Sequence, residues 1–283
     1  MESPVLSNQT FNKIRRLVKE EFGLNLTEQK KSLVLARLQK LLTQNSFNDF
    51  DSYLGFLLKD KTGQALSDFI NKMTTNHTYF NRESKHFDFL RKFVFPQWLP
   101  VIKSYNPTKK IRIWSAGCAS GEEPYQLAME LIDFFGYSQL KEKVAVLATD
   151  ISTEALMQAR QGIYSRENVF NLPPAYVPKF FLPKGANQYV VKPMLKDFIL
   201  FKRLNLIRAT FPFKNRFHVI ICRNVMIYFD QPTKDQLLEK FYQFLEPGGY
   251  LLIGHSESLM QRDKLFKYVQ PSIYQKALKH EGN

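Results

Sequence analysis

Short apolar segments alternate with helical segments after residue 109, and this alternation constrains the fold more than any other feature of the sequence. Helical stretches such as Glu122–Phe135 lie between the apolar segments. Strands that alternate with helices build a mostly parallel sheet with helices on both of its faces. We therefore expect an α/β, doubly wound domain over residues 109–283. The segments expected to form its strands are residues 111–117, 144–150, 217–223 and 250–254.

Residues 163–200 do not fit this alternation. The stretch contains five prolines and two short β-prone segments, residues 188–191 and 197–201. It therefore predicts a small inserted β-subdomain. Near the end of the sequence, the segments 265–269 and 272–278 predict a final antiparallel hairpin.

The first 75 residues have a different pattern, in which apolar side chains recur three and four positions apart. Phe11, Ile14 and Val18 are an example, and no strand-like alternation interrupts the stretch. This spacing is typical of helices that bury one face. We expect residues 1–75 to form an all-α N-terminal domain, a small helical bundle.

Prolines punctuate the stretch between these two parts, at Pro96, Pro100 and Pro107. We interpret residues 76–108 as a linker between the domains. A short helix near Glu83–Phe95 fits the pattern within it.

Composition limits the class of protein without identifying it. The sequence has no run of 18 apolar residues and does not begin like a secretion signal, and its two cysteines do not suggest a disulfide framework. We therefore expect a cytoplasmic protein that is not inserted in a membrane. The net charge of +14 favours an anionic partner, which could be nucleic acid, a membrane surface or an acidic protein.

The ends of the predicted strands are the expected place for a ligand, because doubly wound sheets bind ligands beyond the carboxyl ends of their strands. Gly117–Gly121 is rich in small residues but is neither a GxGxxG fingerprint nor a P-loop. Glu122 and Glu123 suit an amino group or a hydroxyl, or simply a helix N-terminus. Asp150 suits ribose hydroxyls, or it caps the next helix. The small-residue loop and Asp150 together favour a nucleoside ligand.

The segment Cys222–Asn224 ends a third strand, and it lacks the NPPY or DPPY pattern of DNA enzymes that methylate amino groups. Cys222 could in principle act as a nucleophile, as in enzymes that methylate cytosine. A buried free cysteine is far more often inert packing.

Taken together, the segments resemble the CheR family, the chemotaxis receptor methyltransferases. The resemblance extends from the N-terminal helices nearly to the C-terminus, and CRNVMIYF together with GEEPY is its strongest part. The matching segments are TNHTYFNRE (75–83), WSAGCASGEEPY (114–125), ATDIS (148–152), ARQGIY (159–164), LNL (204–206), CRNVMIYFD (222–230) and LEPGGYLLIGHSESL (245–259).

The resemblance implies a Rossmann-like domain that uses S-adenosylmethionine (SAM), preceded by an all-α domain. The expected reaction transfers the methyl group of SAM to glutamate side chains of chemoreceptors, giving glutamyl methyl esters and S-adenosylhomocysteine. It implies no metal. Arg82 and Tyr228 are expected next to the transferred methyl group. The residues expected to bind the cofactor are Asn76, Thr78, Arg82, Glu123, Asp150, Asn205, Leu206, Cys222 and Arg223.

A basic face on the helical segment 28–42 is the expected partner surface. Lys30, Arg37 and Lys40 fall on one side of that helix. Such a face suits an acidic helical bundle, and the resemblance implies docking on the receptor's methylation region. The alternative is an ordinary solvated face. In some members of the family the inserted β-subdomain captures a tether of the receptor, and the sequence leaves that use open here.

The expected chemistry explains why no catalytic histidine or acid pair stands out. A glutamate side chain has an unperturbed pKa of about 4.3, so it is ionised at neutral pH and needs no general base. Two rival functions stay open from the residues alone. One is methylation of nucleic acid, which the charge would suit but the CRNVMIYF segment does not; we expect no nucleic-acid partner. The other is a SAM-binding sensor without turnover.

Overall fold

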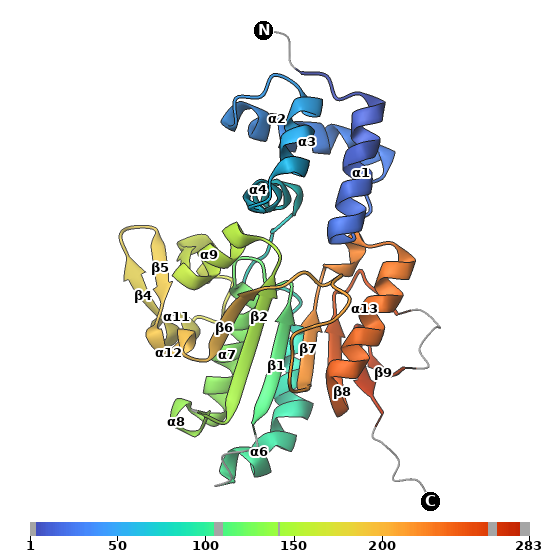
Figure 1. The fold of residues 1–283 in the computed structure, drawn as a ribbon. Helices are drawn as coiled ribbons and strands as arrows, with labels where there is room; N and C mark the ends of the chain where they lie inside the picture. Colours follow the sequence, from blue (N-terminus) through green and yellow to red (C-terminus); the bar gives the residue numbers. More distant parts are fainter. Residues whose placement is uncertain (1–3, 105–109, 141, 260–264, 278–283) are drawn as a thin grey trace, which may run out of the picture.

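A seven-stranded sheet forms the centre of the larger domain in the computed structural model, which describes residues 4–104, 110–140, 142–259 and 265–277 (Figure 1). The strand order is β6-β2-β1-β7-β8-β10-β9, and the first five strands are parallel. The strands β8, β10 and β9 pair antiparallel to one another. Their bounds are β1 Ile111–Ala116, β2 Val144–Asp150, β6 Ile199–Arg203, β7 Phe217–Cys222, β8 Leu245–Ile253, β9 Phe266–Gln270 and β10 Ile273–Lys276.

Side chains alternate between the two faces of this sheet, and each face has its own core. From β1, Ile111 and Ile113 join a core with α5–α7, whereas Trp114 and Ala116 join a core with α13. Trp114 is fully buried, and its indole Nε1 donates to Thr149 Oγ1 at 2.8 Å, so its polar atom is satisfied. The expected α/β fold is therefore confirmed. The helices of this domain are α5 Lys85–Phe89, α6 Phe95–Lys103, α7 Glu122–Phe135, α8 Tyr137–Leu140, α9 Thr153–Gln161 and α13 Gln231–Phe244.

The inserted β-subdomain is smaller than the sequence suggested. Its antiparallel sheet has the order β3-β5-β4. The segment 197–201, which we assigned to the insertion, instead leads into β6, whose Ile199 pairs with Val146 of β2 in the main sheet. Because β6 is an edge strand with exposed residues, its sequence looks like that of a surface strand. The elements of the insertion are β3 Ile163–Ser165, α10 Arg166–Val169, α11 Tyr176–Phe180, β4 Phe181–Lys184, β5 Gln188–Val191 and α12 Pro193–Lys196.

A helical N-terminal domain lies beyond the carboxyl ends of the parallel strands (Figure 1). Ser7 caps its first helix by accepting from Thr10 N, and Gly23 ends that helix in the left-handed conformation. The domain has a separate core that includes Phe11, Leu38 and Phe69. Its elements are α1 Asn8–Phe22, the 3-10 turn η1 Glu28–Lys30, α2 Lys31–Gln44, α3 Phe50–Lys59 and α4 Gln64–Met73.

The segment that we interpreted as a linker is mostly helical. Only residues 74–84 cross between the domains without a helix, and α5, a π-helical turn (η2, Leu90–Val94) and α6 then follow without a break. Pro96 lies directly after the π-helical turn η2, and Pro100 lies inside α6, so the helical run continues past both prolines. These helices pack into the core of the larger domain. Pro107 lies outside the described residues. Among those described, no helix is long and apolar enough to cross a membrane.

Candidate functional site

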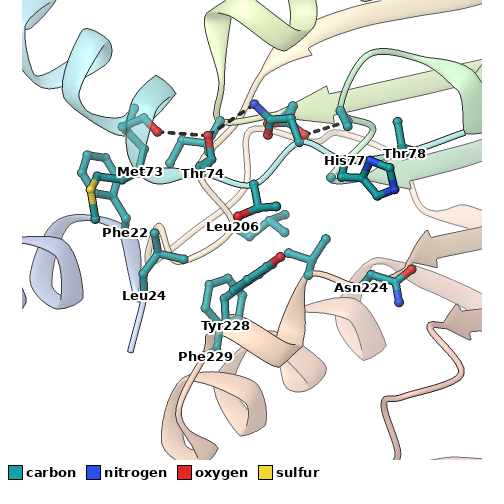
Figure 2. A pocket seen from close by; sticks show the side chains of 18 of the residues that line it. Phe22, Leu24, Met73, Thr74, His77, Thr78, Leu206, Asn224, Tyr228 and Phe229 are labelled. Carbon is teal, nitrogen blue, oxygen red and sulfur yellow. Dashed lines mark hydrogen bonds between the residues drawn. The ribbon is translucent and has the colours of Figure 1, made fainter. Parts of the chain in front are cut away.

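A pocket lies where β1 and β7 adjoin, the position at which the strand order reverses. Doubly wound sheets bind ligands at this switch point. Its lining comes from the segments that follow β1, β2, β6 and β7, and from the helical domain and residues 73–82 on the opposite side. In Figure 2, Thr74, His77 and Thr78 lie along one side of the pocket, and Tyr228 and Phe229 lie along the other.

The loop after β1 forms part of the pocket lining and is closely packed. Gly117 has φ +90°, and a Cβ atom there would come within 2.4 Å of Val225 Cγ2. Ala119 N donates to Asp150 Oδ2 at 2.8 Å, and Ser152 N donates to Oδ1 at 2.9 Å. Burial raises the pKa of Asp150, and these backbone hydrogen bonds act against the rise. The carboxylate is therefore held in one orientation at the end of β2.

The two glutamates at the start of α7 have different surroundings. Glu123 lines the pocket; its Oε1 accepts from Ser115 Oγ at 2.6 Å, and its Oε2 lies 3.2 Å from Arg223 Nε. Burial raises the pKa of Glu123, and Arg223 opposes that rise. Glu122 does not line the pocket, because its carboxylate accepts from Ser120 Oγ and from Asn168 Nδ2.

The crossing segment brings three of the expected residues to the pocket: Asn76, Thr78 and Arg82. Asn76 Nδ2 donates to Ser152 Oγ at 3.1 Å, which ties the segment to the end of β2. Arg82 Nη1 donates to the carbonyl of His77 at 3.1 Å, and its guanidinium lies 5.7 Å from the centre of the Tyr79 ring. These contacts orient the Arg82 guanidinium within the crossing segment.

Tyr228 lies at the boundary between the two domains, at the end of the 3-10 turn η3 (Met226–Tyr228). Its carbonyl accepts from Asn25 N at 2.8 Å, and Leu24 pairs with Phe229 in an isolated antiparallel bridge. The Nζ atom of Lys30 lies 5.8 Å from the centre of the Tyr228 ring. The helical domain therefore contacts the segment that carries one of the two candidate catalytic residues.

The remaining expected cofactor residues divide into those that line the pocket and one that does not. Asn205, Leu206 and Arg223 line it, and Asn205 Nδ2 also donates to the carbonyl of Glu21 at 2.7 Å. Cys222 is 0% exposed and packs in the core beside α13, outside the pocket lining. Burial raises the pKa of its thiol well above the ordinary value, which disfavours the reactive thiolate.

The sequence did not indicate the apolar wall that the helical domain adds to the pocket. The same periodic positions that form a helical core also supply this wall, so no separate pattern marked it. Phe229, after β7, was likewise not singled out. The wall residues from the helical domain are Phe22, Leu24, Leu26, Leu33, Ile70 and Met73.

The three basic residues of the expected docking face also differ from one another. Lys30 and Arg37 line the pocket, whereas Lys40 is exposed and does not. Arg37 donates to the carbonyl of Met73 and to Thr75 Oγ1. Its guanidinium therefore joins α2 to the crossing segment.

The fold and this pocket define a Rossmann-like, SAM-dependent methyltransferase. Residues 76–274 match the family described as CheR methyltransferase, SAM binding domain, and residues 9–74 match the CheR methyltransferase, all-alpha domain. The chain belongs to the CheR methyltransferase family. The family, the fold class and the cofactor expected from the sequence are thereby confirmed.

Curated relatives match nearly the whole chain. The chemotaxis protein methyltransferase of Borreliella burgdorferi is 44% identical over 272 residues, covering 95% of this chain and 95% of that protein. The chemotaxis protein methyltransferase of Escherichia coli K12 is 34% identical, covering 96% and 92%. Chemotaxis protein methyltransferase 2 of Pseudomonas aeruginosa is 35% identical, covering 97% and 98%.

The lining suits SAM in its chemistry. The Asp150 carboxylate would accept from the ribose hydroxyls, and Glu123 would pair with the ammonium group. The apolar wall offers a surface for the adenine. Arg223 lines the pocket, and its Nη1 is buried without a hydrogen-bond partner among the described residues, so it can still donate.

Proposed function

We propose that this protein transfers the methyl group of SAM to glutamate side chains of chemoreceptors, and that the product is a glutamyl methyl ester used in chemotactic adaptation. The observation that carries the proposal is the distribution of charge around the pocket. The acidic residues Asp150 and Glu123 are on the sheet side, where Arg223 pairs with Glu123, and the basic residues Lys30 and Arg37 are on the helical-domain side. A cationic cofactor suits the first side, and a carboxylate acceptor suits the second.

The chain need not remove a proton from such an acceptor. A glutamate carboxylate with a pKa of about 4.3 is already ionised near neutral pH. SAM, when bound, supplies an electrophilic methyl group. The task of the protein is to place the carboxylate in line with that group and to remove its water. We assign to Arg82 the orientation of the carboxylate, and to Tyr228 a hydrogen bond or the shape of the space around the methyl group.

We further propose that the basic face formed by η1 and α2 meets the acidic helices of the receptor, in the cytoplasm. Lys40 is exposed and Lys30 is half-buried, so both can meet an approaching anionic surface. Arg37 already bonds to the Met73 carbonyl and to Thr75, and it would contribute mainly through its charge. The names of the curated relatives support a role in chemotaxis.

The test uses SAM with a radiolabelled methyl group, the purified protein and membranes that carry chemoreceptors. We expect label in the receptor band that mild base releases as methanol, as a carboxyl methyl ester requires. Label in added RNA or DNA, with none in protein, would favour the nucleic-acid alternative. SAM binding by calorimetry without transfer to any acceptor would favour the sensor. Full turnover by both Arg82→Ala and Tyr228→Phe would contradict the roles assigned to these residues.

A further inference from the structure

The two candidate catalytic residues lie on separate segments. Arg82 belongs to the crossing segment 74–84, whereas Tyr228 belongs to η3 after β7. Their relative position must therefore be set by contacts between segments. The loop Gly254–Glu257, which follows β8, contacts the neighbours of both residues.

On the Tyr228 side, the contact is made by the buried carboxylate of Glu257. Its Oε2 accepts from Asn224 N at 3.0 Å and from Gly254 N at 2.6 Å, and its Oε1 accepts from Ile227 N at 3.2 Å. Asn224 has φ +58°, in the left-handed region that, apart from glycine, mainly asparagine and aspartate adopt. A conformation of this kind persists only where surrounding contacts hold it. Glu257 supplies such contacts to the turn that leads into Tyr228.

On the Arg82 side, the contact is made by Glu83. Its Oε1 accepts from His255 N at 3.2 Å, and its Oε2 lies 3.5 Å from Arg223 Nε. Arg223 Nη2 in turn donates to the carbonyl of Arg82 at 2.7 Å. Glu83 also has a positive φ, +53°, so its backbone depends on these contacts as well.

We propose that Glu83 and Glu257 are positioning residues, which join the Arg82 and Tyr228 segments through the loop Gly254–Glu257. A Cβ atom on Gly254 would come within 3.0 Å of Asn224 N and of Glu257 Oε2, so this loop packs directly against the turn that it holds. The inference rests on the proposed function, because it takes Arg82 and Tyr228 as the groups beside the transferred methyl.

The same region could be considered for a metal ion, because ligand atoms of Glu83, His86 and His255 lie within 4.8 Å of one another. The Arg223 guanidinium, however, is 3.5 Å from the Glu83 carboxylate, the single carboxylate of this group. A divalent cation there would meet a buried positive charge at short range. We therefore assign the Glu83 carboxylate to Arg223 and to the His255 N–H.

Hydrogen exchange measured by mass spectrometry tests the proposal without reference to activity. Glu257→Gln replaces one accepting oxygen by a donor, so we expect exchange in the peptide covering Asn224–Tyr228 to rise at least about tenfold. Glu83→Gln should do the same for the peptide containing His255. Glu130→Gln is the matched control, because Glu130 is a buried glutamate that bonds to Arg91 and Tyr176 instead. It should leave both peptides unchanged.

Unchanged exchange in both peptides, or an equal rise in the Glu130 control, would overturn the proposal. If Glu257→Gln does not fold, Glu257→Asp withdraws the carboxylate by one methylene and should give the same local rise. A stoichiometric divalent ion in the purified protein that His255→Ala releases would also overturn it, because Glu83 would then be a metal ligand.

A kinetic cycle tests whether the two glutamates act through the catalytic candidates. Misplacing a reacting group by about 1 Å can cost roughly 100-fold in rate. We expect Glu257→Gln to lower kcat by about 10–100-fold in the wild-type background but by less than about threefold in Tyr228→Ala. Glu83→Gln should behave in the same way against Arg82→Ala. If the effects of the two substitutions on kcat were fully additive, the proposed positioning role of the glutamates would be refuted. If the wild type methylates no receptor, the proposed function fails, and the exchange measurement still decides whether the loop holds the two segments.

Discussion

Replacing Gly117 by alanine should separate two costs in the loop that follows β1. The first is conformational, because φ is +90°, and it amounts to about 1–2 kcal/mol for a residue with a Cβ atom. The second is steric, because the new Cβ atom would lie 2.4 Å from Val225 Cγ2. Overpacking of this kind costs about 1–3 kcal/mol. We expect Gly117→Ala to lower the melting temperature and to weaken SAM binding.

The steric cost should lower the affinity for the cofactor, because Gly117 and Val225 both line the pocket. If that part falls entirely on the cofactor-binding conformation, the Kd for SAM rises by about 5–150-fold. Isothermal calorimetry measures the Kd, and thermal unfolding without SAM measures the stability. Gly63→Ala is the matched control: its φ is +74°, and a Cβ atom there would meet nothing within 4 Å. It should lose stability and keep the wild-type Kd.

A second variant tests the clash itself. Val225→Ala removes the methyl group that the new Cβ atom would meet, so adding it to Gly117→Ala should recover most of the steric part and none of the conformational part. The single variant Val225→Ala supplies the baseline for this comparison. Wild-type SAM affinity in Gly117→Ala would refute the reasoning. So would a double variant that binds SAM no better than Gly117→Ala.

Three further variants test other contacts of the site. Asp150→Asn should raise the Kd for SAM by about 10–150-fold in calorimetry, since hydrogen bonds to a charged group contribute about 1.5–3 kcal/mol; an unchanged Kd would show that the carboxylate does not meet the cofactor. His86 is 1% exposed, and burial lowers its pKa from 6.5 to about 3. Between pH 6.5 and about pH 3, His86 is therefore protonated in the unfolded chain but not in the folded protein, so the free energy of unfolding falls as the pH falls. The loss is at most about 1.4 kcal/mol per pH unit, and urea unfolding at pH 5 and pH 7 should show a smaller difference in His86→Gln than in the wild type. Asn71→Ala should lower the free energy of unfolding by about 1–2 kcal/mol in the same assay, because Asn71 Oδ1 accepts from Thr153 N at 2.9 Å at the start of α9. Stability equal to the wild type would show that this contact between the domains is dispensable.

The central strands could be predicted from the sequence because burial on both faces leaves a distinctive pattern. Residues 144–150 form β2 with the bounds expected, and Glu122–Phe135 forms α7. The edge strand β6 was misassigned, because one exposed side gives it the sequence of a surface strand. The prolines of α6 were misleading for another reason. Pro96 and Pro100 both lie within the helical run from α5 to α6, which a π-helical turn interrupts without ending.

The pocket lining was predictable where it comes from the end of a strand. Asp150 is the last residue of β2 and Glu123 follows β1, and topology alone brings such positions together. The wall from the helical domain was not predictable, because Phe22 and Leu33 have the spacing of any amphipathic helix. The roles of the site residues stay predictions until the variants are measured. Arg37 shows why: its charge was visible in the sequence, but its bond to the Met73 carbonyl was not.

If the adenine packs against the apolar wall, the helical domain takes part in the cofactor equilibrium. Part of the free energy of cofactor binding is then also free energy of association between the two domains. Thermodynamic linkage makes such an effect reciprocal. If a partner lowers the affinity for the cofactor by loosening the contact of Asn25 with Tyr228, then the bound cofactor lowers the affinity for that partner by the same factor. If a receptor docked on the helical domain shifted that contact, it would alter the cofactor affinity without touching the cofactor, and the size of that change would measure how strongly the two domains are coupled.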